Sequence, residues 1–311
     1  IAEITQIKGD SETHSKFSPE DAFADFEIYP YYIQRRWTEY NPQRGDFVRE
    51  ALKRGLELEA NLGQNPYRLG VIGSTDSHTA LSSAEEDNFH GKLATDSIPA
   101  NKTSNFNDDG PGSSGWAMSA SGMAAVWADS NTRSDIMDAL ERREVYATTG
   151  PRIAVQFYGG PDFTEADLEN ADLHTLATAR GVPMGGELHQ PETPTFLVLA
   201  TKDPKGANLD RIQMVKGWLN ADGQSQEKIY NLAWSDERPL KSNGSLPDVG
   251  NTVNLKTGKV DNRIGAAQLA AAWADPQFDP DQSAFYYVRV LQIPTARHSL
   301  LDAIALGMDH A

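Results

Sequence analysis

The chain has 311 residues, 39% hydrophobic and 23% charged, which is enough apolar material for a folded core and a length typical of about two domains. Its formal net charge is −16, with no run of Lys and Arg, and this argues against a nucleic-acid partner. The sequence has no cysteine, which excludes disulfides, cysteine-ligated zinc and thiol nucleophiles, and no apolar run approaches the ~20 residues of a membrane span.

The first 150 residues alternate between strand and helix patterns. Residues 1–7 alternate apolar and polar side chains and predict a strand, and residues 18–27 begin with the Ser-Pro-Glu-Asp pattern of a helix start. Residues 46–61 have helical periodicity and end near a capping glycine, and residues 68–73 predict a second strand. A helix follows over 131–143. Because a helix connects the two strands, we expect them to pair in parallel.

The second half of the chain is rich in strand patterns. Short apolar segments recur between Gly, Pro and Asp turns, as is typical of an antiparallel β-sandwich. One helix is expected at 264–274. We place a boundary near Gly150, which gives domains 1–150 and 151–311. The expected strands are 145–148, 153–158, 195–200, 211–215, 228–234 and 285–293.

Asp76 and His78 form the most informative pattern. They lie in the segment Gly-Ser-Thr-Asp-Ser-His-Thr, directly after the predicted strand 68–73, and a long polar stretch follows over 81–115. Residues two apart on an extended segment point the same way, so a carboxylate oxygen and an imidazole nitrogen can converge on one metal ion. The ends of strands in β/α folds are common places for sites. A surface turn with local hydrogen bonds is the alternative.

Glu12 and His14 form a second pair with the same spacing, after the strand 1–7. Their roles stay open between metal ligand, general base, substrate contact and a solvated loop. Two such pairs at the ends of neighbouring parallel strands would meet at one mouth, and we name Glu12 and His14 as candidate catalytic residues. His90, after an acidic run, and Arg143, at the end of a helix, are candidates for substrate binding. A solvated surface and a favourable interaction with the helix dipole are the respective alternatives.

The combined pattern resembles the polymerase-and-histidinol-phosphatase (PHP) superfamily of metal-dependent hydrolases. The segments AEITQIKGDSETHSKFSPEDAFADFE and YRLGVIGSTDSHTALSSAEEDNFHGK carry the resemblance, together with RIQMVKGW and FYYVRVLQIPTARHS. They are similar to a large branch of unknown function related to carbaryl hydrolases. The resemblance implies a distorted seven-stranded β/α barrel, followed here by an antiparallel β-sandwich. It implies two or three Zn, Mn or Fe ions, with Asp76 and His78 among their ligands.

The H-x-H motif that opens the superfamily's barrel is absent from the chain. The resemblance therefore covers only the C-terminal part of such an enzyme. We expect a preceding segment, or a separate chain, to complete the barrel and to supply the remaining metal ligands.

The expected function is hydrolysis of phosphoester bonds, or of carbamate, ester or amide bonds, by metal-activated water acting on a small molecule. The alternative is a non-catalytic β-sandwich module with a degenerate metal site that binds carbohydrate or protein through Trp and Tyr side chains. Relatives in the resembled branch imply a periplasmic or extracellular location, with the cytoplasm as the alternative.

Overall fold

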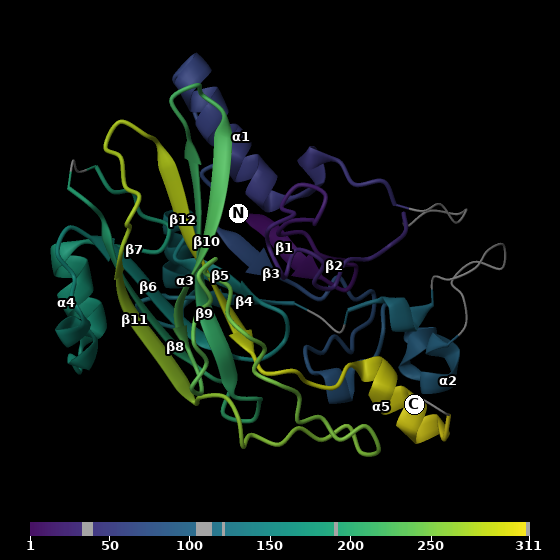
Figure 1. Ribbon diagram of the computed structural model, residues 1–311. Helices are drawn as coiled ribbons and strands as arrows, with labels where there is room; N and C mark the ends of the chain where they lie inside the picture. Colours follow the sequence, from purple (N-terminus) through teal and green to yellow (C-terminus); the bar gives the residue numbers. More distant parts are fainter. Residues whose placement is uncertain (33–39, 104–113, 120–121, 190–191, 309–311) are drawn as a thin grey trace.

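The computed structural model describes residues 1–32, 40–103, 114–119, 122–189 and 192–308 (Figure 1). Part of the predicted polar stretch, residues 104–113, lies outside these ranges. Two antiparallel sheets occupy one side of the molecule, and the N-terminal strands, the long loops and the last helix occupy the other. Within the described ranges, no helix has both the length and the apolar character needed to cross a membrane.

The N-terminal sheet has the strand order β2-β1-β3. Strand β1 (Ala2–Gln6) pairs in parallel with β3 (Val71–Gly73), and helix α1 (Val48–Leu62) lies between them in the sequence, as predicted. Strand β2 (Gly9–Asp10) folds back antiparallel onto β1. Gly9 has φ +94°, and a Cβ there would collide with the carbonyl oxygen of Glu27, so this turn requires glycine.

Two of the three helices predicted in the first half are present, within two residues of the expected ends. Helix α1 stops at Gly63, whose left-handed backbone returns its N–H to the carbonyl of Glu59. Helix α3 (Arg133–Arg142) starts at Thr132, whose side chain accepts the N–H of Asp135. This helix connects β4 (Met123–Val126) to β5 (Val145–Thr148), which pair antiparallel.

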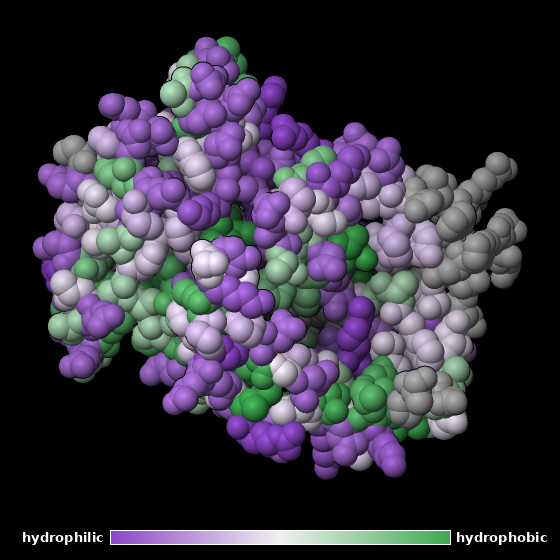
Figure 2. All heavy atoms as spheres, viewed as in Figure 1, coloured by the Kyte–Doolittle hydropathy of each residue, from purple (hydrophilic) through white to green (hydrophobic). Residues whose placement is uncertain are grey.

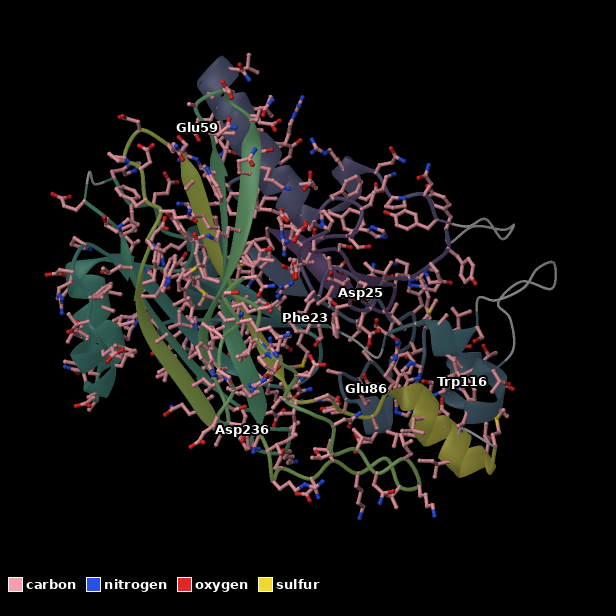
Figure 3. The ribbon with its side chains drawn as sticks, viewed as in Figure 1. Phe23, Asp25, Glu59, Glu86, Trp116 and Asp236 are labelled. Carbon is pink, nitrogen blue, oxygen red and sulfur yellow. The ribbon has the colours of Figure 1, made fainter. Side chains whose placement is uncertain are left out.

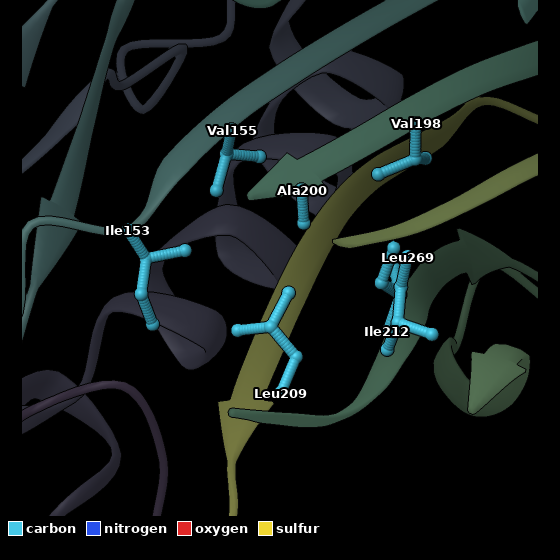
Figure 4. Packing of buried hydrophobic residues seen from close by; sticks show 7 residues of the cluster. All are labelled: Ile153, Val155, Val198, Ala200, Leu209, Ile212 and Leu269. Atoms are coloured by element: carbon cyan, nitrogen blue, oxygen red, sulfur yellow. The ribbon is translucent and has the colours of Figure 1, made fainter. Parts of the chain in front are cut away.

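The second half consists of two antiparallel sheets that pack face to face. One has the order β10-β9-β12 and the other β11-β8-β6-β7. Ile212 from the first sheet and Val198 from the second are fully buried in the core between them (Figure 4). The strands are β6 (Ala154–Gly160), β7 (Val182–Pro183), β8 (Thr195–Thr201), β9 (Leu209–Leu219), β10 (Ser225–Trp234), β11 (Gln268–Ala274) and β12 (Ala284–Gln292).

Helix α4 covers the outer face of the sheet that contains β8. Leu173 and Ala177 of helix α4 pack against Leu197 of β8. The helices not yet placed are α2 (Pro99–Lys102), α4 (Leu173–Arg180) and α5 (His298–Leu306), and the 3-10 helices η1 (Arg44–Asp46), η2 (Glu86–Asn88), η3 (Ala94–Ser97), η4 (Gly115–Ala117) and η5 (Glu165–Glu169).

The expected fold class, part of a β/α barrel followed by an antiparallel β-sandwich, is wrong. No barrel closes in the described part of the chain, where β1 and β3 are the only parallel pair. Strand β2 takes the other edge of β1, and β4 and β5 form a separate two-stranded sheet. The architecture is mixed α/β with several antiparallel sheets. The domain boundary near Gly150 stays a prediction.

Two local helix predictions are also wrong. Residues 264–274 contain strand β11, whose pairing with β8 overrides the helix preference of an alanine-rich sequence. Residues 18–27 form consecutive turns instead of a helix. Here Asp21 is buried and forms ion pairs with Arg49 and Arg289, so long-range charge pairing replaces the helical start.

Helix α5 packs on the loop between β3 and β4. Asp302 forms an ion pair of 2.8 Å with Lys102, and Glu86 Oε2 accepts the backbone N–H of His298 at 2.6 Å. Figure 3 shows Glu86 beside α5. Burial raises the pKa of Glu86 to about 7 and lowers the pKa of His298 to about 4. The visible surface is mostly hydrophilic, but hydrophobic residues gather over α5, where Leu306 is exposed (Figure 2).

Candidate functional site

The turn that carries Asp76 and His78 follows the parallel strand pair. Ser74 N–H donates to the carbonyl of Thr5 on β1 at 3.1 Å, and Gly122 N–H donates to the carbonyl of Ser74 at 2.9 Å. The turn is thus held on both sides by backbone hydrogen bonds. Because β1 and β3 are parallel, the segments after them leave from the same edge of the sheet.

Asp76 and His78 lie together, but not on the extended segment that the prediction assumed. His78 Nε2 lies 3.3 Å from Asp76 Oδ1. Asp76 has φ 46°, in the left-handed region that non-glycine residues seldom occupy. Such backbone strain persists only where surrounding contacts hold it, and it concentrates at functional sites.

Two lysines complete what we call the Asp76 site: Lys8, Asp76, His78 and Lys92. Lys8 Nζ and Lys92 Nζ both contact Oδ2 of Asp76, Lys92 at 2.9 Å. Partial burial of Asp76 opposes its ionisation, but the hydrogen bonds from Lys8 and Lys92 outweigh this and lower its pKa to about 2. Asp76 is therefore a carboxylate throughout the physiological pH range.

Residues 91–92, farther along the loop between β3 and β4, hold the turn that carries Asp76 and His78. His78 N–H donates to the carbonyl of Lys92 at 2.8 Å, and Ser77 Oγ donates to the carbonyl of Gly91 at 3.2 Å. Lys92 thereby contributes both its backbone and its side chain, and its Nζ lies 3.2 Å from His78 Nε2. Lys8 and Lys92 lie far apart in the sequence, and nothing in their local patterns indicates that they share Asp76 as a partner.

The donor types at this site fit a divalent metal ion, but their number is incomplete. The Lys92 ammonium group already places a positive charge between a carboxylate oxygen and an imidazole nitrogen, the position that a metal ion would take. Structural and catalytic zinc sites use three or four protein ligands. Across the described ranges, no group of three or more His, Asp or Glu side chains is arranged to hold a metal ion. Within the described ranges, Asp76 and His78 alone are therefore too few to hold a metal ion, and their role as metal ligands stays a prediction.

Glu12 lies in a different cluster, which we call the Glu12 network: Glu12, Asp21, Arg49, Tyr287 and Arg289. Arg49 Nη2 lies 2.5 Å from Glu12 Oε1, and Arg289 Nη1 lies 3.3 Å from Oε2. Burial opposes ionisation of Glu12, but Arg289 and Arg49 outweigh it and lower its pKa. A carboxylate held this way is a weak base, so the network fits a structural role better than proton transfer.

His14 lies on a small aromatic cluster beside the first turn of α1. Its ring centroid is 5.6 Å from that of Phe47 and 6.3 Å from that of Phe17, and Nδ1 accepts the backbone N–H of Lys16. Burial and the nearby Lys16 lower its pKa. Among the described residues, no hydrogen bond or ion pair joins Glu12 or His14 to Asp76 or His78.

The two predicted substrate-binding residues lie apart from each other. Arg143 ends helix α3 in a left-handed conformation, and its Nη2 donates to the carbonyl of Gly185 at 2.8 Å. This contact ties α3 to the segment after β7. His90 is half-buried just after η2, two residues before Lys92. Their roles in substrate binding stay predictions.

Two of the aromatic side chains considered for carbohydrate or protein binding, Trp273 and Tyr286, pack against other rings. The ring of Trp273 on β11 lies 5.0 Å from that of Tyr230 and 5.9 Å from that of Phe196. Tyr286 on β12 lies 4.6 Å from Phe196 on the facing sheet. These rings pack between the two sheets, so they do not form an open platform.

Residues 1–311 match the family described as "Protein of unknown function (DUF3604)". The chain belongs to this family. Comparisons with curated proteins and with solved structures give no match. Membership of DUF3604 brings no assigned activity, so the resemblance of the chain to the PHP superfamily stays a prediction.

Proposed function

We propose that this DUF3604 chain is part of a metal-dependent hydrolase that cleaves phosphoester bonds, or carbamate, ester or amide bonds, in a small molecule. The observation that carries the proposal is the convergence of Asp76 and His78 at the end of a parallel strand pair, around a carboxylate that stays ionised. The sequence resemblance supports two or three Zn, Mn or Fe ions. Asp76 and His78 would bind one of them, with further ligands from other segments.

A divalent ion at this position lowers the pKa of a water molecule and stabilises the negative charge that develops on the bond under attack. The chain's own residues prepare that position. Asp76 needs no deprotonation to bind a cation, and the backbone bond from His78 to Lys92 fixes the imidazole near it. Lys8 and Lys92 must leave Oδ2 of Asp76 when a metal ion takes their place.

Metal content of the natively purified protein, measured by mass spectrometry together with its intact mass, tests this proposal. Asp76→Ala and His78→Ala are each expected to lower metal content and to lower hydrolysis of p-nitrophenyl phosphate and p-nitrophenyl acetate in parallel. His189→Ala, at a side chain 82% exposed, is the control and should change neither. Full metal content and activity in Asp76→Ala would refute the assignment.

A further inference from the structure

Two ammonium groups share one carboxylate oxygen in the Asp76 site. Lys8 comes from the turn between β1 and β2, and Lys92 comes from the loop between β3 and β4. Both contact Oδ2 of Asp76, and Lys92 also donates to the backbone carbonyl of Asp76 at 3.1 Å. Two segments 84 positions apart therefore bring like charges together at one atom.

The charges at this site do not balance. In the part of the chain that the structure describes, Asp76 is the only carboxylate within ion-pair distance of either lysine. The exposed fractions of the side chains are 33% for Lys8, 13% for Lys92 and 25% for Asp76, so water screens the two ammonium groups only in part. One positive charge is left over, although the whole chain carries a formal net charge of −16.

The balance of charge differs between the clusters of buried cations: Arg211 and Arg238 share the single carboxylate of Asp210, but both also donate to the backbone carbonyl of Pro247. Arg49, which is completely buried, contacts three carboxylates, those of Glu12, Asp21 and Glu227. At the Asp76 site, by contrast, Asp76 is the only partner of Lys8 Nζ among the described residues, so no further acceptor offsets the repulsion between the two lysines. The second lysine is explained if a further negative group binds there.

We propose that Lys8 and Lys92 form a binding site for an oxyanion beside Asp76 and His78, and that this oxyanion is an anionic group of the substrate. An ammonium group has three N–H donors, and a single contact to Asp76 accounts for one of those of Lys8. A phosphate or carboxylate group offers several acceptor oxygens and can bridge both lysines.

The second part of this inference rests on the proposed function, because it identifies the anion with the molecule that is hydrolysed. A metal ion bound to Asp76 and His78 would release both ammonium groups and add positive charge. The need for a negative group then increases. The lysines therefore favour substrates with a phosphate or carboxylate group over neutral carbamates, esters and amides.

Anion binding to the full chain, stripped of metal with a chelator, separates this inference from the hydrolase proposal. Inorganic phosphate and acetate are titrated by calorimetry at low ionic strength into the wild-type chain and into Lys8→Met, Lys92→Met and the double variant. We expect each single change to weaken binding about tenfold, the worth of one charge-assisted hydrogen bond. Lys256→Met, on an exposed turn, is the matched control and should bind like the wild type.

Two further variants guard against loss of fold. Lys8→Arg keeps the charge and should retain binding, and Asp76→Asn removes the competing carboxylate and should tighten binding about tenfold while lowering metal content. A preference for phosphate or for acetate identifies the anionic group.

Equal binding by the wild type and the double lysine variant would overturn the inference, as would no binding by the wild type or weaker binding by Asp76→Asn. Anion binding in a protein that holds no metal and hydrolyses nothing would instead overturn the proposed function alone.

Discussion

Tyr287 donates a hydrogen bond of 2.6 Å to the carboxylate of Glu12, a residue 275 positions earlier in the chain. The same oxygen of Glu12 accepts from Arg49. The loop after β2 is thereby attached to β12, the last strand of the antiparallel sheets. This contact makes Glu12 part of the connection between the two halves of the molecule.

Glu12→Gln should destabilise the protein by about 2 to 3 kcal/mol at pH 7, because it removes a mostly buried negative charge from between Arg49 and Arg289. The pKa of Glu12 is lowered in the folded state, so this stabilisation is present above the ordinary pKa of a glutamate and is lost as the pH falls below it. Urea unfolding at pH 7 and at pH 3 measures both effects.

Glu20→Gln, at an exposed position, is the control for this change. A double-mutant cycle with Tyr287→Phe should show a coupling energy of about 0.5 to 3 kcal/mol between the two positions. Stability of Glu12→Gln within about 0.5 kcal/mol of the wild type would contradict a structural role for the Glu12 network.

Glu86→Gln should stabilise the protein at pH 8 by up to about 3 kcal/mol and leave it unchanged near pH 4. Burial raises the pKa of Glu86 to about 7 in the folded state, with Glu27 and Asp87 adding to the shift and Arg297 opposing it. The folded protein therefore holds this proton more tightly, and the stability that it provides is lost as the pH rises from about 4.5 to 7.

His298 has the opposite effect in nearly the same range. Its pKa is lowered to about 4, so its contribution is lost as the pH falls from about 6.5 to 4. The difference between Glu86→Gln and the wild type, taken from urea unfolding at each pH, isolates the glutamate. Glu141→Gln, on the exposed face of α3, should show a flat difference. The same flat difference for Glu86→Gln would refute the prediction.

Gly73→Ala should destabilise the strand that leads to the Asp76 site by about 1 to 3 kcal/mol. A Cβ at Gly73 would lie 2.8 Å from backbone atoms of Met123 and Thr148, so β3 and the β4–β5 pair would have to separate. Gly45→Ala, where a Cβ meets nothing within 4 Å, is the control. Thermal unfolding of both variants measures the effect, and equal midpoints would contradict it.

Ile212→Ala should cost about 2 to 5 kcal/mol, because it leaves a cavity between the two antiparallel sheets. Ile212 is fully buried there, whereas Leu240 is 42% exposed on a loop. Chemical denaturation should therefore show a much smaller loss for Leu240→Ala. Similar losses in the two variants would indicate that the core lies elsewhere.

Local signals predicted part of the fold. The capping glycine Gly63 indicated the end of α1, and the strand–helix–strand order predicted the parallel pairing of β1 with β3. The sequence does not show which distant strands pair with each other. The segment 264–274 is rich in alanine and therefore indicated a helix. Its strand partner β8 lies more than 60 residues earlier in the chain, so the local sequence gave no sign of this pairing.

In the candidate site, too, contacts between distant segments were not predicted from the sequence. Asp76 and His78, two positions apart, lie 3.3 Å from each other, although Asp76 is left-handed and not extended. Lys8 and Lys92 reach that position through separate segments, and no sequence pattern relates them. Glu12 has the same spacing to His14 as Asp76 has to His78, yet its partners come from α1 and β12. Spacing alone therefore does not determine which side chains meet.

The span of the Glu12 network affects how the chain folds during synthesis. Tyr287 and Arg289 are made 275 and 277 residues after Glu12. Until then the charged loop that contains Glu12 lacks two of its partners, and contacts of such long range slow folding. We expect the first half to stay only partly ordered on the ribosome and to be most sensitive to proteases before β12 emerges.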